Sequence, residues 1–253
     1  DDSELAEAKT GTWNESHIHR SLANNSAVYS NDTSKEQFKA EWAKLVASGS
    51  GERGIFNPDV RKFMPKRRDI GPDVGTNPCS EILLRPDEFC NLTEVIVRPK
   101  DSEEDILRKV AYAALLGTLQ STLTDFNFLG DSWKKNCEEE RLLGVSLTGV
   151  CDHPVLSEVS GESKSCLRKA KLVSLVSNGL AANVLGINTS ASITCVKPSG
   201  TVSQLCNTAS GLHPRYAPYY IRRVRMDSKD SLAIWLKDQG VPCEVDFYSK
   251  DNL

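Results

Sequence analysis

The spacing of apolar residues changes several times between the period of a helix and the period of a strand. A capping pair, Asp101 and Ser102, precedes three acids and a helical run, which predicts a helix from residue 103. We expect the helix to continue through Ile106, Val110, Ala113, Ala114, Gly117 and Leu119. A second long helix is predicted over 163–185, with Leu167, Leu172, Leu175, Val176, Leu180 and Val184 facing inward.

Two shorter helices are predicted near the beginning of the chain. Ser34 can cap a helix that ends at the Ser-Gly-Ser-Gly run 48–51. Its expected buried face is Phe38, Trp42, Leu45 and Val46. A short helix is also expected over 4–9, whereas the charges and prolines of 55–74 predict an irregular connection.

Strand-like runs alternate with the helices. Residues 91–97 alternate and are rich in β-branched side chains, residues 143–150 resemble a short buried strand or turn, and 193–196 is a plausible strand. Strands separated by long helices need crossover connections. The order of elements therefore predicts an α/β fold with parallel strands.

Composition and charge narrow the class of protein. The 253 residues carry 26% charged side chains and a net charge of −3, and no apolar run reaches the ~20 residues of a membrane span. The basic segment 215–225 is interpreted as a strand with a solvated face, so neither a nucleic-acid surface nor a membrane is an expected partner. Eight cysteines without a signal peptide favour a reducing, cytoplasmic compartment. The ends predict an excerpt whose N-terminal and C-terminal parts are missing.

The densest chemistry lies in residues 76–92. Asn77, Cys79 and Glu81 are two positions apart, so they project to one side of an extended segment, and Pro78 disfavours a helix there. Cys90 follows after the polar turn 85–88. A thiol, a carboxylate and a carboxamide in this pattern predict a reaction centre.

Other interpretations of the cysteines remain open. Any single cysteine can be a small buried apolar residue, and Cys79 and Cys90 could form a disulfide or a redox pair. No metal site is expected, because the chain has no C-x-x-C pair and His17 and His19 are expected to be exposed.

A second chemical segment is Lys197 to Leu205, which predicts a turn that opens a helix. Backbone N–H groups and hydroxyls at such a turn suit a phosphate, although a capped helix with a glycine in its turn is the ordinary alternative. The spacing is not that of a P-loop. The candidate phosphate ligands are Pro198, Ser199, Gly200, Thr201, Val202 and Ser203.

These segments carry a family resemblance. Asn-Pro-Cys-Ser-Glu-Ile at 77–82, followed by Phe-Cys-Asn-Leu at 89–92, resembles the finger-loop signature of ribonucleotide reductases, in the form of the adenosylcobalamin-dependent (class II), triphosphate-reducing enzymes. Further similar segments are 22–29, 51–56, 141–149, 197–205, 211–214 and 220–225. The resemblance implies part of a ten-stranded α/β barrel over 1–253, with a finger loop at about 75–92 and a phosphate-binding turn at about 197–205.

The resemblance also implies a reaction and its participants. The family reduces ribonucleotides to 2′-deoxyribonucleotides for DNA synthesis, with adenosylcobalamin as cofactor and thioredoxin or a similar dithiol as reductant. Cys79 would become a thiyl radical, Glu81 would act as base on the 3′-hydroxyl and Asn77 would orient the hydroxyls.

Cys90 would supply half of the reducing dithiol. The first 78 residues contain no cysteine, so its partner is expected before Asp1, and the fragment alone is expected to be inactive. Cys195 is a disfavoured substitute, because a buried strand cysteine is usually inert. The alternatives are a large subunit of a metal-radical-dependent reductase, or a non-catalytic nucleotide-binding or thiol-redox module.

Overall fold

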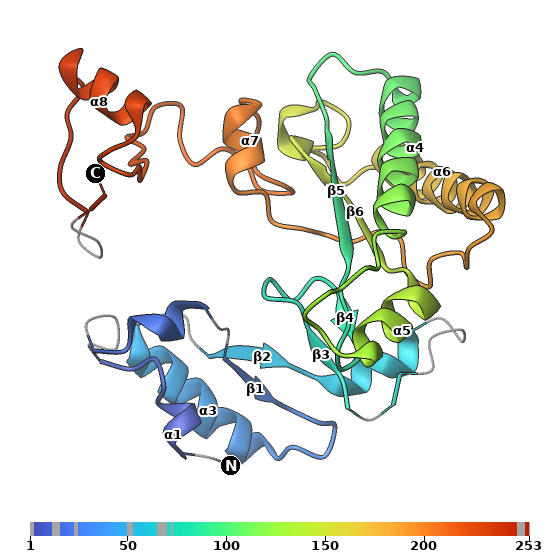
Figure 1. Ribbon diagram of the computed structural model, residues 1–253, viewed down its shortest axis with the longest axis horizontal. Coiled ribbons are helices and arrows are strands. Elements are labelled where there is room, and N and C mark those ends of the chain that lie inside the picture. The colour runs from blue at the N-terminus through green and yellow to red at the C-terminus, as the bar shows by residue number, and fades with distance from the viewer. Residues whose placement is uncertain are drawn as a thin grey trace. The chain divides into compact units, whose positions relative to one another are not determined.

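The computed structural model describes residues 3–11, 16–22, 25–49, 53–64, 70–71, 73–246 and 251–252. The chain divides into two compact units, which Figure 1 shows by residue number. One unit joins Asp1–Asn57 with Ala217–Leu253, and the other is Pro58–Tyr216. The second unit contains every candidate site residue.

Two consecutive β-α-β crossovers form the centre of the 58–216 unit. β5 (Asn91–Ile96) and β6 (Leu143–Thr148) pair in parallel, and α4 (Glu103–Gln120) connects them (Figure 1). After β6, α6 (Gly161–Leu185) returns the chain so that Thr194 bridges Val145 in parallel. The predicted α/β arrangement with parallel strands is confirmed here, although the expected strand 193–196 is reduced to this bridge.

The start of α4 agrees with the sequence prediction. The Ser102 hydroxyl accepts from the Asp105 N–H at 3.1 Å, and the Asp105 carboxylate accepts from the Ser102 N–H at 3.0 Å, which is a capping box. All six residues expected to continue the helix lie in α4. Leu119 is the exposed member of the six, and the neighbouring Thr118 is buried.

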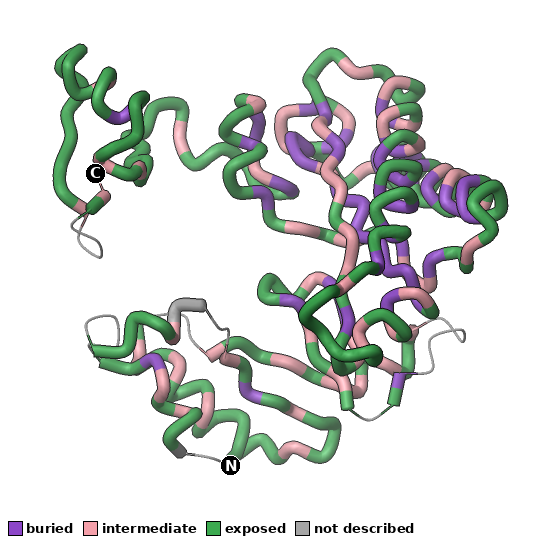
Figure 2. The backbone as a smooth tube through the Cα atoms, in the orientation of Figure 1, coloured by how far each residue is buried: buried purple, intermediate pink, exposed green. Residues whose placement is uncertain are grey.

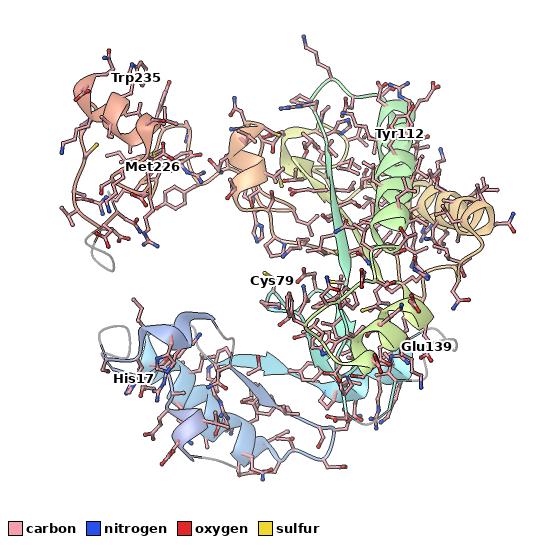
Figure 3. All side chains as sticks on the ribbon, viewed as in Figure 1. His17, Cys79, Tyr112, Glu139, Met226 and Trp235 are labelled. Atoms are coloured by element: carbon pink, nitrogen blue, oxygen red, sulfur yellow. The ribbon has the colours of Figure 1, made fainter. Side chains whose placement is uncertain are left out.

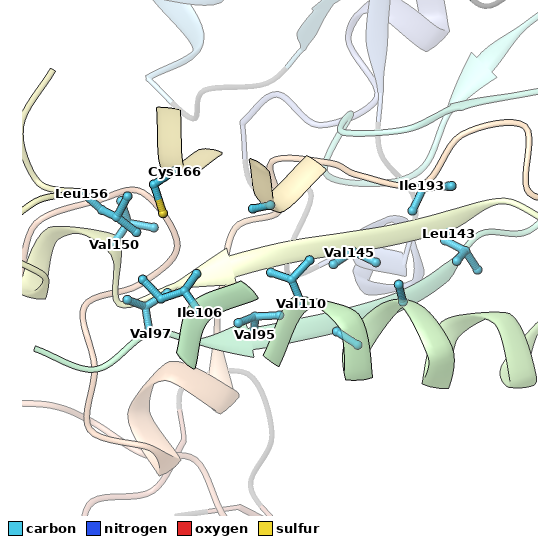
Figure 4. Packing of buried hydrophobic residues seen from close by; sticks show 13 residues of the cluster. Val95, Val97, Ile106, Val110, Leu143, Val145, Val150, Leu156, Cys166 and Ile193 are labelled. Atoms are coloured by element: carbon cyan, nitrogen blue, oxygen red, sulfur yellow. The ribbon is translucent and has the colours of Figure 1, made fainter. Parts of the chain in front are cut away.

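The core of this unit lies between the strands and the helices. Thr93, Val95, Leu143 and Val145 alternate onto one side of the β5-β6 pair, and the cluster in Figure 4 packs α4 against that side. Gly117 lets α4 come close, because a Cβ there would lie 3.3 Å from Leu143 Cδ2. The even-numbered strand residues face the opposite side, where the candidate site lies.

The predicted inward face of α6 is wrong. The six large apolar residues assigned to it are exposed, up to 84% for Val184, as the exposed stretches of α6 in Figure 2 show. Its buried positions carry small or polar residues four apart, which let α6 approach α4 closely. They include Cys166, Ala170, Ser174, Asn178 and Ala182.

Among the described residues, no helix is long and apolar enough to cross a bilayer.

The 58–216 unit also contains a short hairpin and several short helices. β3 (Gly75–Thr76) and β4 (Leu83–Leu84) form an antiparallel hairpin. α5 (Asp131–Glu140) was not predicted, and α7 (Thr201–Leu205) is the short helix expected after the phosphate turn. Two 3-10 helices, η2 and η3, complete the unit at Pro58–Phe63 and Val150–Asp152.

The other unit repeats the crossover on a small scale. β1 (Ser26–Val28) and β2 (Gly54–Phe56) pair in parallel, and α3 (Lys35–Ser48) connects them. The predicted Ser34 cap is confirmed, but none of the α3 residues is buried, so its expected inward face is wrong. Other helices in the described part of this unit are α1 (Ser3–Ala6), η1 (Ile18–Leu22) and α8 (Ser231–Asp238).

Three other expectations differ from the structure. The helix expected over 4–9 is only the single turn α1, and β2 and η2 lie within the predicted irregular stretch 55–74. Residues 65–69 and 72 of that stretch lie outside the described residues. The basic segment 215–225 is not a strand, because its backbone has no ladder partner.

Candidate active site

A tight hairpin presents the candidate residues of the finger loop. The Asn77 N–H donates to the Ile82 carbonyl at 3.2 Å, and the Ser80 N–H donates to the Asn77 carbonyl at 2.9 Å. Ser80 has a left-handed φ of 61°. The expected extended segment is therefore wrong, because a turn separates Cys79 from Glu81.

The turn gives the three side chains different environments. Cys79 is exposed on the loop, where Figure 3 labels it. The Glu81 side chain is only 2% exposed. Asn77 is buried, and its Oδ1 accepts from the Ile82 N–H at 3.0 Å. The Asn77 oxygen thus closes the hairpin and leaves its Nδ2 as the group that could meet a ligand.

Lys197 is a charged residue of the site to which the sequence gave no role. Its Nζ lies 3.1 Å from Glu81 Oε1, and the Cys79 side chain is close enough to affect its pKa. Burial, the largest influence, lowers the pKa of Lys197, but the nearby Cys79 and Glu81 side chains outweigh it and raise the pKa. The ammonium group therefore keeps its proton at neutral pH. A lysine directly before the predicted turn was the available signal.

Cys90 and Cys195 lie near the same carboxylate. Burial and then the negative charge of Glu81 raise the pKa of Cys90 to about 11. Burial, Glu81 and Cys90 raise the pKa of Cys195 to about 12. Gly144 makes room between the strands, because a Cβ there would lie 2.4 Å from Leu92 Cδ2 and 3.1 Å from Cys195 Sγ. All eight cysteines are free, so the disulfide considered between Cys79 and Cys90 is not formed.

The thiols of Cys90 and Cys195 should react slowly with alkylating agents. A pKa of about 11 leaves the Cys90 thiolate at pH 8 about 100-fold less populated than that of a thiol with a pKa of 9.0. We expect iodoacetamide to label Cys90 about 100-fold more slowly than a cysteine in a short model peptide, as followed by mass spectrometry. The rate at Cys90 should rise tenfold per pH unit up to about pH 11. Equal rates at pH 8 would contradict this.

Helix α5 holds the far end of the finger loop. The Arg85 guanidinium lies 3.0 Å from the Glu139 carboxylate and donates to the Asn136 carbonyl at 3.1 Å. The Phe89 N–H donates to Cys137 Sγ at 3.4 Å, one residue before Cys90. Figure 3 labels Glu139 on α5. An unpredicted helix therefore fixes the position of Cys90.

The candidate phosphate turn uses part of its polar groups internally. Ser199 Oγ accepts from the Ser203 N–H at 3.2 Å, and Ser203 Oγ donates to the Gly200 carbonyl at 2.8 Å. Both serine side chains are buried, whereas Pro198, Gly200, Thr201 and Val202 are exposed. The exposed backbone of 200–202 and the Thr201 hydroxyl are the groups that remain for a ligand.

The structure thus brings together Asn77, Cys79, Glu81, Cys90 and the unassigned Lys197 and Cys195. The turn 198–203 follows Lys197 directly in the chain. No group of three His, Cys, Asp or Glu residues suited to a metal occurs within the described ranges.

Several known proteins are similar to this chain in sequence and in fold. A reductase of Lactobacillus acidophilus, named adenosylcobalamin-dependent ribonucleoside-triphosphate reductase, is 32% identical over 234 residues, which cover 81% of this chain. The equivalent protein of Levilactobacillus brevis is 30% identical over 93% of this chain. A crystal structure of a B12-dependent (class II) ribonucleotide reductase matches the whole chain with a TM-score of 0.73 and 27% identity. The chain is homologous to class II ribonucleotide reductases.

The matches cover most of this chain but only part of each relative. The chain spans 31% and 35% of the two curated relatives and 38% of the class II structure. The alpha subunit of the Actinobacillus ureae class Id reductase aligns with 87% of this chain and over 48% of its own length. The TM-score is 0.59 and the identity is 17%, so this similarity shows a shared fold alone. No protein-family model matches the chain.

Proposed function

We propose that this chain carries the reactive cysteine and the base of an adenosylcobalamin-dependent ribonucleoside-triphosphate reductase. The observation that carries the proposal is the exposed Cys79 thiol beside the buried Glu81 carboxylate, both in contact with Lys197. The names of the homologues support the same activity. In this proposal residues 1–253 are part of the ten-stranded reductase barrel, with the finger loop at 75–92 and the phosphate-binding turn at 197–205.

The chain's own residues divide the reaction between them. The Cys79 thiyl radical takes the 3′-hydrogen of the ribose, and Glu81 accepts the proton of the 3′-hydroxyl. The Cys90 thiol gives a proton to the 2′-hydroxyl, which then leaves as water. The free Nδ2 of Asn77 donates to a ribose oxygen, because its Oδ1 is already bonded to Ile82. The exposed groups of 200–202 bind the substrate phosphates.

The residues present fit the cofactor. When bound, adenosylcobalamin supplies the radical that makes Cys79 reactive. The Cys79 side chain is exposed at the hairpin turn, so an outside group can reach its sulfur. Glu81 stays covered beneath it, where a carboxylate can accept a proton without direct access to solvent.

Cys90 supplies one of the two thiols that reduce the substrate. Its raised pKa keeps the proton on its sulfur, where it can be given to the 2′-hydroxyl of the substrate. We propose that its partner is a second cysteine of the full-length protein and that thioredoxin or a similar dithiol reduces the resulting disulfide. Free thiols of this kind fit a reducing, cytoplasmic compartment.

The dependence on adenosylcobalamin tests the proposed function. The full-length protein should convert ribonucleoside triphosphates to deoxyribonucleoside triphosphates with dithiothreitol only when adenosylcobalamin is added, and triphosphates should be preferred to diphosphates. The isolated 253-residue chain should be inactive. Reduction without adenosylcobalamin would point to the metal-radical class, and nucleotide binding without reduction would point to a non-catalytic module.

A further inference from the structure

Lys197 connects the reactive hairpin to the phosphate turn. Its side chain reaches Cys79 and Glu81, while Pro198 begins the turn directly after it. We propose that Lys197 is a positioning residue that holds the Glu81 carboxylate and the Cys79 thiol in their reactive arrangement, and that it is not a phosphate ligand. The assignment rests on the proposed function and adds a residue to it.

The first argument is the charge balance of a buried carboxylate. Glu81 is 2% exposed, and neither of its oxygens has a hydrogen-bond partner among the described residues. A buried carboxylate without compensation is strongly unfavourable. Lys197 Nζ at 3.1 Å supplies the compensating charge. The buried position of the Glu81 carboxylate therefore depends on Lys197.

The second argument is that the backbone of Lys197 is held in place. Gly211 has a φ of 55°, and a Cβ at that position would lie 3.1 Å from the Lys197 carbonyl oxygen. The Ser210 hydroxyl donates to the carbonyl of Ser199, two residues further along. These contacts fix the start of the turn, so the reach of the lysine side chain toward the hairpin is fixed with it.

The third argument concerns the direction of the side chain. A lysine beside a phosphate site ordinarily acts as a point charge for the phosphate. Here the Lys197 side chain is only 23% exposed and its ammonium is already paired with Glu81. Binding a phosphate would leave the buried carboxylate without its cation. The geometry therefore assigns the charge of Lys197 to the reacting groups.

Kinetics of the full-length protein separate the two roles. Lys197→Met, which keeps the length but removes the charge, should lower kcat about 100-fold with KM changed less than about twofold, because one partner of a buried pair is lost. Lys197→Arg should recover kcat to within about tenfold of the wild-type value. A raised KM with unchanged kcat, or no change in either constant, would overturn the assignment.

A charge-sensitive labelling experiment tests the contact without requiring reductase activity. The ratio of the alkylation rates of Cys79 with anionic iodoacetate and neutral iodoacetamide cancels the thiolate fraction and reports the local charge. Removal of one cation at a few ångströms should lower that ratio about threefold in Lys197→Met, and much less in Lys197→Arg. The ratio at Cys243 is the internal control and should not change.

The kinetic and labelling measurements distinguish failure of the Lys197 assignment from failure of the proposed function. An unchanged Cys79 ratio in a folded Lys197→Met protein would sink the Lys197 assignment even if the wild type reduces nucleotides. A wild type that reduces no ribonucleotide with adenosylcobalamin, but whose ratio falls in the variant, would refute the proposed function and leave the Lys197 contact established. If Lys197→Met does not fold, the ratio in Lys197→Arg and Lys197→Gln decides.

Discussion

Replacing Cys79 by serine should lower ribonucleotide reduction in the full-length protein by at least about 10⁴-fold, because the reacting group itself is removed. An oxygen-centred radical forms far less readily than a thiyl radical, so the serine hydroxyl cannot replace the thiol. Cys79 is exposed and lies outside the packed core, so the substitution should leave the fold unchanged. The measurement is deoxyribonucleotide formation in the presence of adenosylcobalamin.

Two comparisons make the Cys79→Ser result specific. The affinity for the nucleotide should stay within about twofold of the wild-type value, because the proposed phosphate contacts are made by residues 200–202. Cys243→Ser changes an equally exposed thiol outside the 58–216 unit and should keep full activity. Turnover by Cys79→Ser at more than a few per cent of the wild-type rate would remove Cys79 from the radical role.

Replacing Gly149 by alanine should destabilise the protein by about 3 kcal/mol. Gly149 has a φ of 79°, and a Cβ there would lie 2.4 Å from the Val97 carbonyl oxygen and 3.3 Å from Thr208 Cβ. The left-handed conformation costs a non-glycine residue about 1–2 kcal/mol, and crowding against backbone that cannot move adds about 1–3 kcal/mol. Denaturant unfolding gives the free energy of unfolding.

Gly186→Ala is the matched control for Gly149→Ala. Gly186 has a similar φ of 64°, but a Cβ there would meet no atom within 4 Å. Its substitution should cost only the conformational part, about 1–2 kcal/mol. Equal losses at the two positions would show that the close approach of Gly149 to Val97 does not restrict the packing around the end of β6.

Local signals predicted the elements they belong to. Ser34 and Ser102 each cap the helix expected after them, because a hydroxyl and a residue three positions later satisfy the first free N–H groups within one turn. The parallel pairing of β5 and β6 also followed from their order around α4. The grouping of Asn77, Cys79 and Glu81 was visible because these residues are neighbours in the sequence.

Local sequence signals did not predict which face of α6 is buried or that the reactive segment turns at Ser80. The large apolar residues of α6 suggested the buried face, but the helix packs through Cys166, Ala170 and Ser174, since small side chains let α6 lie close to α4. The hairpin was expected to be extended, but Ser80 adopts a left-handed conformation that the hydrogen bonds of Asn77 with Ile82 hold in place.

The sequence by itself determined the cap residues, the order of strands and helices, and the identity of the reactive side chains, because each of these depends on residues close together in the chain. Only the tertiary structure decided that Lys197 pairs with Glu81 and that Gly149 lies against Val97. It also decided that the charge of Glu81 acts on both Cys90 and Cys195. Lys197 and Cys195 are more than about 100 residues from Glu81, and Gly149 is about 50 residues from Val97, so these contacts depend on how the strands and helices pack.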